Sequence, residues 1–153
     1  MPDYSNAVIY KLCCKDLSIK DIYIGSTCNF KERKRHHKSA CNKEGNRQYN
    51  ENKYQVIRDN GGWDNWLMIM VKEFSCDNKR QLETEERKNI EELKPTLNEC
   101  IPVRTRKEYR HANKQIIKEK KKKEYEKDKE KIKARSHKRY NEKKEEILKK
   151  QKE

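Results

Sequence analysis

The feature that most constrains this chain is the uneven distribution of its charge. Residues 104–153 hold 22 Lys and Arg against 10 Asp and Glu, a net charge of +12, whereas residues 1–103 carry a net charge of +2. Because 43% of the 153 residues are charged and 31% are apolar, the chain has too little apolar area for a core along its whole length. We therefore expect a compact domain at residues 1–102 and a basic tail at residues 103–153.

The tail contains neither glycine nor proline and shows a degenerate repeat, in which a tyrosine precedes an isoleucine by seven positions at Tyr109, Tyr125 and Tyr140. Residues seven apart share a helical face, so we expect a helix, about 70 Å long if it is continuous. The copies lie 15 to 16 residues apart, an interval that does not fit whole turns and disfavours a coiled-coil seam. A partly disordered, solvated segment is the alternative.

A dense run of cations favours nucleic acid as the partner, because phosphate contacts release condensed counterions. Double-stranded DNA is the expected ligand and RNA is the second possibility. A membrane is not expected, since the tail lacks a broad apolar face, no apolar stretch is long enough to cross a bilayer, and no signal-like region follows Met1. The protein should be soluble and intracellular. The predicted nucleic-acid contacts are Lys34, Arg35, Lys38, Arg104, Arg106, Lys107, Arg110, Lys114, Lys118, Lys120, Lys121, Lys122 and Lys123.

The six cysteines lie in hydrophobic segments without any Cys-x-x-Cys spacing. We expect reduced and mostly buried thiols in a reducing compartment. A zinc site at His36, His37 and Cys41 is a weaker interpretation, since no fourth ligand lies at a familiar interval.

The apolar pattern of residues 1–102 predicts the order β-β-α-α-β-α. Residues 7–14 and 21–26 are short and β-rich, which indicates an antiparallel pair, and Trp66–Val71 has the same character. Helices are expected at residues 30–41, behind the N-cap Asn29, around residues 54–57, and at residues 78–93, where Pro95 prevents continuation. The fold class is α+β, with a three-stranded antiparallel sheet flanked by helices.

The predicted third helix places one carboxylate in an unfavourable position. Leu82, Ile90 and Leu93 define its inward stripe, and Glu86 falls in the middle of that stripe. A carboxylate facing a core is costly unless a cation holds it, so Glu86 either forms an ion pair or binds a metal. Glu85 is the alternative if the helix is rotated.

Four further polar residues lie on the predicted sheet or point toward it. Arg33 and His37 lie four residues apart, beside the apolar side of the first helix. Strand alternation places Tyr23 and Gly25 on one face, with Tyr10 across the hairpin. Each residue alone would be an ordinary surface or packing residue.

The combination resembles the GIY-YIG nuclease family over about the first hundred residues. The similarity rests on Val8-Ile9-Tyr10, on Tyr23-Ile24-Gly25-Ser26-Thr27 followed by Arg33 and His37, and on Glu86 followed by Asn98. The resemblance is greatest to stand-alone members of large DNA viruses that also have a basic repetitive tail. Val8 departs from the family, which usually has glycine there, and we expect this to change local strand packing more than chemistry.

This resemblance implies a metal-dependent endonuclease acting on DNA, with one Mg²⁺ or Mn²⁺ bound by Glu86. A single carboxylate suffices for Mg²⁺, which keeps several waters and binds substrate phosphate. Arg33 would stabilise charge on the phosphate, and Tyr10 and Tyr23 would place hydroxyls beside the attacking water, with Tyr10 as a candidate base. His37 would orient that hydroxyl or relay its proton. Gly25 and Asn98 would support the site.

The implied activity has a competing interpretation: a catalytically inactive DNA- or RNA-binding protein on the same fold. Residue patterns alone do not indicate sequence preference, oligomeric state or biological role.

Overall fold

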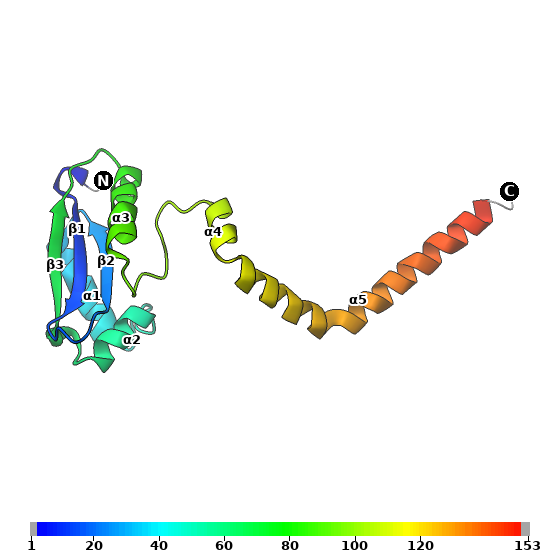
Figure 1. Ribbon diagram of the computed structural model, residues 1–153, viewed down its shortest axis with the longest axis horizontal. Helices are drawn as coiled ribbons and strands as arrows, with labels where there is room; N and C mark the ends of the chain where they lie inside the picture. Colours follow the sequence, from blue (N-terminus) through cyan, green and yellow to red (C-terminus); the bar gives the residue numbers. More distant parts are fainter. Residues whose placement is uncertain (1–2, 151–153) are drawn as a thin grey trace. The chain divides into compact units, whose positions relative to one another are not determined.

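Across the residues it describes, 3–150, the computed structural model forms the predicted α+β fold, a three-stranded antiparallel sheet with flanking helices (Figure 1). The side chains of residues 145–147, 149 and 150 lie outside this description. The elements are η1 (Tyr4–Asn6), β1 (Val8–Cys14), β2 (Ile22–Thr27), α1 (Phe30–Asn42), α2 (Asn52–Asp59), η2 (Trp63–Asn65), β3 (Trp66–Glu73), α3 (Lys79–Leu93), α4 (Arg106–Ala112) and α5 (Lys114–Lys150). The predicted order in residues 1–102 is confirmed.

The central strand of the sheet is β1, which pairs antiparallel with β2 on one side and β3 on the other. Its side chains alternate between two buried layers. Tyr10, Leu12 and Cys14 pack in a core with residues of α1 and α2. Ile9 faces the opposite way and belongs to a second core to which α3 contributes. Helices therefore cover both faces of β1, and polar residues on α1 and α3 can approach the sheet from opposite sides.

Each of the two helices that hold predicted site residues has a defined start. The side chain of Asn29 accepts a hydrogen bond from the Glu32 amide at the start of α1, and Asn78 does the same for the Gln81 amide at α3. Such caps satisfy backbone N–H groups that have no partner inside the helix. Helix α3 ends at Leu93, before Lys94 in the left-handed conformation and Pro95. Both helices thus begin at a defined residue.

One residue of the predicted inward stripe of α3 is misplaced. Leu82 and Ile90 are buried, but Leu93 is 41% exposed, so its assignment to the core was wrong. Leu93 is the final helical residue, and the following αL residue turns the chain before a further core contact can form. The stripe is therefore shorter than its periodicity suggested.

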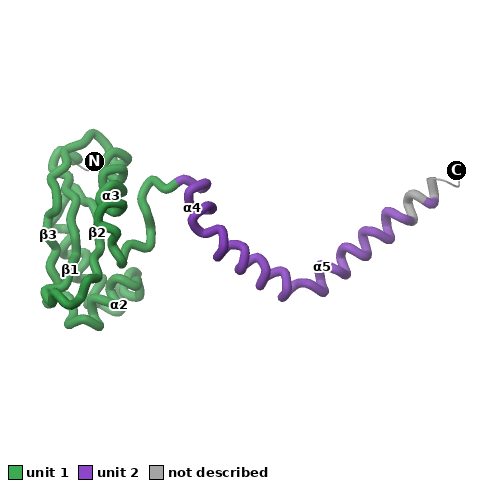
Figure 2. The backbone as a smooth tube through the Cα atoms, viewed as in Figure 1, with its two compact units in different colours: residues 1–104 green, residues 105–153 purple. Residues whose placement is uncertain are grey.

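The tail is a separate unit. The chain divides into compact units of residues Met1–Arg104 and Thr105–Glu153 (Figure 2). Within the second unit, the turn residue Asn113 separates α4 from α5, so the helix is not continuous from its start. Tyr109, Ile116, Tyr125, Ile132 and Tyr140 are all exposed, and the side chain of Ile147, in the third repeat, lies outside the described residues. The repeat therefore builds no apolar core in the described tail.

The cysteines are free thiols, but the expectation that most of them would be buried was wrong. Cys14 and Cys41 are buried, Cys13, Cys28 and Cys76 are half-buried, and Cys100 is exposed. Their hydrophobic sequence neighbours face different layers of the fold, so proximity in sequence did not predict burial. Within the described part of the chain, no helix has the length and apolar character needed to cross a membrane.

Candidate active site

A cleft of about 880 Å³ lies within the first unit, and most of its lining comes from five segments. Strand β2 contributes Tyr23 and Ser26, and the first turn of α1 contributes Arg33. Glu51 and Lys53 lie at the start of α2, and Glu86 lies on α3. Residues 97–102, which follow α3, complete the lining. The cleft thus gathers cationic side chains, carboxylates and tyrosine hydroxyls from elements that are distant in sequence.

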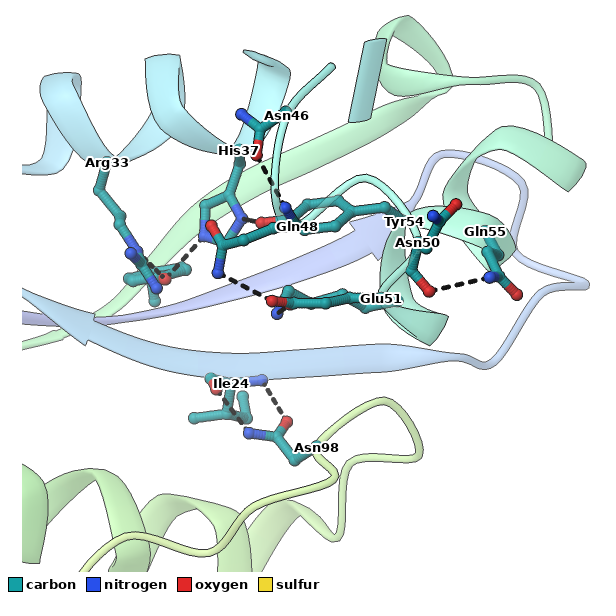
Figure 3. A network of polar contacts seen from close by, with 12 residues as sticks. Ile24, Arg33, His37, Asn46, Gln48, Asn50, Glu51, Tyr54, Gln55 and Asn98 are labelled. Atoms are coloured by element: carbon teal, nitrogen blue, oxygen red, sulfur yellow. Dashed lines mark hydrogen bonds and ion pairs between the residues drawn. The ribbon is translucent and has the colours of Figure 1, made fainter. Parts of the chain in front are cut away.

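A chain of buried polar side chains stands behind this cleft. The hydroxyl of Tyr10 accepts a hydrogen bond from Arg33 Nε at 2.9 Å and lies 2.8 Å from His37 Nε2. The other ring nitrogen, His37 Nδ1, lies 2.8 Å from the hydroxyl of Tyr54 (Figure 3). Because the Tyr10 hydroxyl oxygen accepts the hydrogen bond from Arg33, the Tyr10 hydroxyl proton is free to be donated to His37 Nε2. His37 Nδ1 then carries the imidazole proton and donates it to the Tyr54 hydroxyl. This series of hydrogen bonds anchors the Arg33 guanidinium through its contact with the Tyr10 hydroxyl.

His37 is 1% exposed and sits among four aromatic rings, those of Tyr10, Tyr23, Tyr54 and Trp63. Burial, helped by the charge of Arg33, lowers the pKa of His37 to about 3. His37 is therefore neutral at physiological pH, and relaying a proton through a charged imidazole is unfavourable. Of the two predicted roles, orientation of the Tyr10 hydroxyl fits the structure. Both ring nitrogens are engaged, so the zinc interpretation of His37 does not fit it.

The two tyrosines occupy different positions. Tyr10 is fully buried and does not line the cleft, whereas Tyr23 is half-buried and does. Burial raises the pKa of Tyr10 far above that of a free phenol, because the opposing charge of Arg33 does not offset desolvation. Burial also raises the pKa of Tyr23, with the charge of Glu86 as the next cause. The expectation that nearby cations would activate Tyr10 as a base therefore does not fit, and Tyr23 is the hydroxyl presented to the cleft.

Gly25 pairs directly with Tyr10 across the β1–β2 ladder. A Cβ at this position would lie 2.5 Å from the Tyr10 hydroxyl oxygen, 2.7 Å from Tyr10 Cζ and 2.9 Å from Tyr23 Cε1. No side chain fits at these distances, so the absence of a Cβ allows the Tyr10 ring to cross the strand and reach Arg33 and His37. The predicted supporting role of Gly25 thus has a steric basis.

Adjacent glutamates on α3 have different environments. Glu85 is 6% exposed and lies 2.7 Å from Lys72 Nζ and 3.1 Å from Lys88 Nζ, so it forms the ordinary ion pairs weighed as an alternative for Glu86. Glu86 lines the cleft and accepts a 2.5 Å hydrogen bond from the hydroxyl of Ser26. Glu86 has no ion-pair partner among the described residues, and burial raises its pKa. The carboxylate available to a ligand is therefore Glu86 and not Glu85.

The Glu86 environment fits a hard divalent cation. Its carboxylate lines the cleft, and a bound cation would compensate the cost of burying its charge. No cluster of three or more His, Cys, Asp or Glu suited to a metal occurs in the described chain. A metal here would therefore keep most of its coordination for water and phosphate, as Mg²⁺ commonly does.

Asn98 lies beside the outer edge of β2. Its Oδ1 accepts a hydrogen bond from the Ile24 amide at 2.8 Å, and its Nδ2 donates one to the Ile24 carbonyl at 2.7 Å (Figure 3). The side chain thus replaces a neighbouring strand for one residue of the edge. Because Ile24 lies between Tyr23 and Gly25, this contact fixes the backbone that carries both.

The predicted basic contacts are mostly exposed, although Arg35 pairs with Glu32 at 2.6 Å. Lys34, Arg35 and Lys38 are exposed on α1, and Lys38 lies 3.7 Å from Asp64. In the tail all the predicted contacts are exposed except the half-buried Arg104. Site residues that sequence reasoning missed are Ser26, Tyr54 and Lys53. Ser26 was visible within the Tyr-Ile-Gly-Ser-Thr tract, but Tyr54 and Lys53 had no local signal because a loop separates them from α1.

Comparison with known proteins adds one positive finding. A family model described as the GIY-YIG catalytic domain matches residues 6–98, more than half of the chain. No curated protein and no solved structure matches the chain. The matched segment begins before β1 and ends at Asn98, so it contains Tyr10, Tyr23, Arg33, His37 and Glu86 as well.

Proposed function

Because this chain belongs to the GIY-YIG family of nucleases, we propose that it is a divalent-metal-dependent endonuclease that hydrolyses phosphodiester bonds in DNA. The observation that supports this most directly is the meeting of Arg33 and Glu86 in one cleft, although they lie on helices against opposite faces of the sheet. A guanidinium and a carboxylate without an ion-pair partner suit a phosphate and a cation, respectively.

The chain's own residues divide the work as follows. Arg33 donates to the non-bridging phosphate oxygens, where negative charge increases as water attacks phosphorus. Tyr10 and His37 hold the Arg33 side chain in position before substrate arrives, which removes an ordering cost from the reaction. Tyr23 places its hydroxyl beside the attacking water. Glu86 would hold the cation, and the hydroxyl of Ser26 orients the Glu86 carboxylate.

A divalent cation bound there would supply charge neutralisation for the phosphate and the departing oxygen. The water oxygen forms the new bond to phosphorus and gives up one proton to the solvent, while the bond from phosphorus to the 3′ oxygen breaks and that oxygen takes up one proton, so the net change is the addition of one water molecule. The products are a 5′-phosphate and a 3′-hydroxyl.

We further propose that the basic tail supplies non-specific affinity for DNA. Among the described side chains of α4 and α5, most cations are exposed, and ion pairs such as Lys129–Glu126 and Lys133–Glu130 engage some of them. Truncation after Val103 is expected to leave some cleavage while weakening DNA binding steeply at moderate salt. Equal affinity of the truncated and full chains, measured by fluorescence anisotropy, would refute this role.

The nuclease proposal is tested by incubating the protein with supercoiled plasmid and Mg²⁺, with and without a chelator. We expect nicking that requires the metal, is abolished in Glu86→Ala and persists in Glu85→Ala, the neighbouring carboxylate that forms structural ion pairs. Mapping of the ends should give 5′-phosphates. Nicking by Glu86→Ala would place the metal elsewhere, and no nicking by the wild-type protein would favour an inactive binding protein.

A further inference from the structure

Lys53 holds its ammonium in an unusual place for a lysine. Its side chain is 14% exposed and lines the cleft, and Nζ forms an ion pair with the Glu51 carboxylate. The same nitrogen lies 5.0 Å from the ring centroid of Tyr23 and 4.9 Å from that of Tyr54. The two faces fix the cation between the tyrosine that faces the cleft and the tyrosine that ends the buried polar chain.

Local helix stability does not account for this arrangement. Lys53 is the second residue of α2, where the helix dipole is positive and a cation is unfavourable. Glu51 occupies the N-cap position, yet its side chain makes no capping hydrogen bond. Serine, threonine, asparagine or aspartate would cap this end better. Glu51 and Lys53 therefore do not stabilise the start of α2 and instead form an ion pair at the cleft. Residue choices that disfavour the local helix are typical of functional positions.

Glu51 is also held independently of Lys53. Its Oε1 accepts a 2.9 Å hydrogen bond from Gln48 Nε2 (Figure 3). Its other carboxylate oxygen accepts a hydrogen bond from Lys53 Nζ. Removal of the ammonium would therefore leave the carboxylate with a partner. The lysine stem has four rotatable bonds, so its head can leave one oxygen and reach another.

We propose that Lys53 is a phosphate-binding residue of the substrate cleft, whose ammonium exchanges the Glu51 carboxylate for a phosphate of the bound nucleic acid. This rests on the proposed function, because it requires that the phosphodiester backbone enter the cleft. In the described chain the cations of the cleft are Arg33, Lys53 and Lys79. Lys79 is 75% exposed and lies 3.4 Å from Glu83, so Lys53 is the more enclosed of the two lysines. Lys53 makes α2 a second wall for the backbone, beside Arg33 on α1.

The exchange makes an unusual prediction about Glu51. A carboxylate that acts as internal counterion competes with DNA for Lys53, so Glu51→Gln should bind DNA more tightly and Lys53→Met more weakly. An ion pair with a purely structural role predicts that both changes weaken binding. The double variant separates direct charge repulsion from competition, since the gain from Glu51→Gln should vanish when Lys53 is absent.

The experiment measures binding of a fluorescein-labelled DNA duplex by full-length protein carrying Glu86→Gln, so that cleavage does not interfere. Anisotropy is recorded over a range of KCl concentrations for the background, Lys53→Met, Lys53→Arg, Glu51→Gln and the double variant. Lys43→Met is the matched control, because Lys43 is exposed at the C-cap of α1 and does not line the cleft. Circular dichroism melting verifies that each variant is folded.

We expect Lys53→Met to reduce the slope of log affinity against log salt by about 0.9, the contribution of one phosphate contact to duplex DNA. Lys53→Arg should retain the slope, and Lys43→Met should leave it unchanged. If Lys53→Met fails to fold, two variants still test the proposal: Glu51→Gln should bind DNA more tightly than the background protein, and Lys53→Arg should retain its slope. Unchanged or weaker binding by Glu51→Gln, or a gain that persists in the double variant, would overturn the proposal. Since binding is read without cleavage, failure of the nuclease proposal would show separately, as an absence of nicking by the wild-type protein.

Discussion

Replacement of Gly25 by alanine tests whether the site depends on the close approach of Tyr10 to the β2 backbone. The added Cβ would lie 2.5 Å from the Tyr10 hydroxyl oxygen, which must move by about 0.9 Å to reach the 3.4 Å of ordinary contact. Tyr10 is fully buried, and its oxygen is held between Arg33 and His37 at 2.9 and 2.8 Å. Hydrogen bonds in proteins span only about 2.7–3.2 Å between heavy atoms, so a shift of this size cannot preserve both.

Two magnitudes follow from this displacement. Overpacking a buried site costs about 1–3 kcal/mol, and each kcal/mol lowers the Tm of a domain of this size by about 4–8 °C. A misplacement of about 1 Å in a catalytic group lowers the rate by about 100-fold. We expect Gly25→Ala to show both effects, measured by thermal melting and by plasmid nicking with Mg²⁺.

A second glycine provides the control. A Cβ at Gly45 would meet nothing within 4 Å, so Gly45→Ala should melt and cleave as the wild-type protein does. Tyr10→Phe in the Gly25→Ala background removes the closest clashing atom and should recover part of the stability, but not the activity, because Arg33 then lacks its buried acceptor. If Gly25→Ala matches Gly45→Ala in both assays, the steric argument is wrong.

Three further changes test the electrostatics and the framework of the site. Burial raises the pKa of Glu86, so its carboxyl ionises more easily in the unfolded chain than in the folded protein. The free energy of unfolding therefore falls as pH rises from the ordinary glutamate range through the pKa of the folded state. Glu86→Gln should have a higher free energy of unfolding in urea than the wild-type protein at pH 7, with no difference near pH 3. Arg33→Lys keeps the charge but loses the planar fork and the Nε bond to Tyr10, and nicking should fall by about 10²–10³-fold with a small change in Tm. Asn98→Ala removes both hydrogen bonds to the Ile24 backbone and should lower the free energy of unfolding by about 1–3 kcal/mol in urea titrations.

The sequence predicted those parts of the fold that depend on local signals. Apolar periodicity, the cap Asn29 and the helix break at Pro95 were sufficient to locate the strands and the helices of the first unit, because each signal lies within a few residues of the element it specifies. Their i, i+4 spacing also placed Arg33 and His37 toward the sheet, as the contacts with Tyr10 confirm. The assignment of Leu93 to the core failed because periodicity does not show where a helix stops covering its neighbour.

Other parts of the site depend on contacts between distant segments. Tyr54 meets His37 from a helix that follows an exposed loop, and no residue pattern near Tyr54 distinguishes this contact from ordinary packing. The same holds for Lys53, whose significance depends on the tyrosine faces beside it. The sequence also did not show which tyrosine faces the cleft, because Tyr10 and Tyr23 belong to the same aromatic cluster, with ring centroids 6.3 Å apart.

Glu85 and Glu86 are adjacent on α3, yet one forms structural ion pairs and the other faces the cleft. Successive helical residues are rotated by about 100°, so one carboxylate points to the lysines beside α3 and the next into the cleft. Glu85 gains two ammonium partners and a lowered pKa, whereas Glu86 gains a single hydroxyl and a raised one. A residue that serves stability alone would show the first environment. The burial of Glu86 without a cation partner costs stability at neutral pH, and such a cost is understandable if a cation arrives with the substrate; Glu86→Gln, more stable and inactive, would demonstrate both sides of that exchange in one variant.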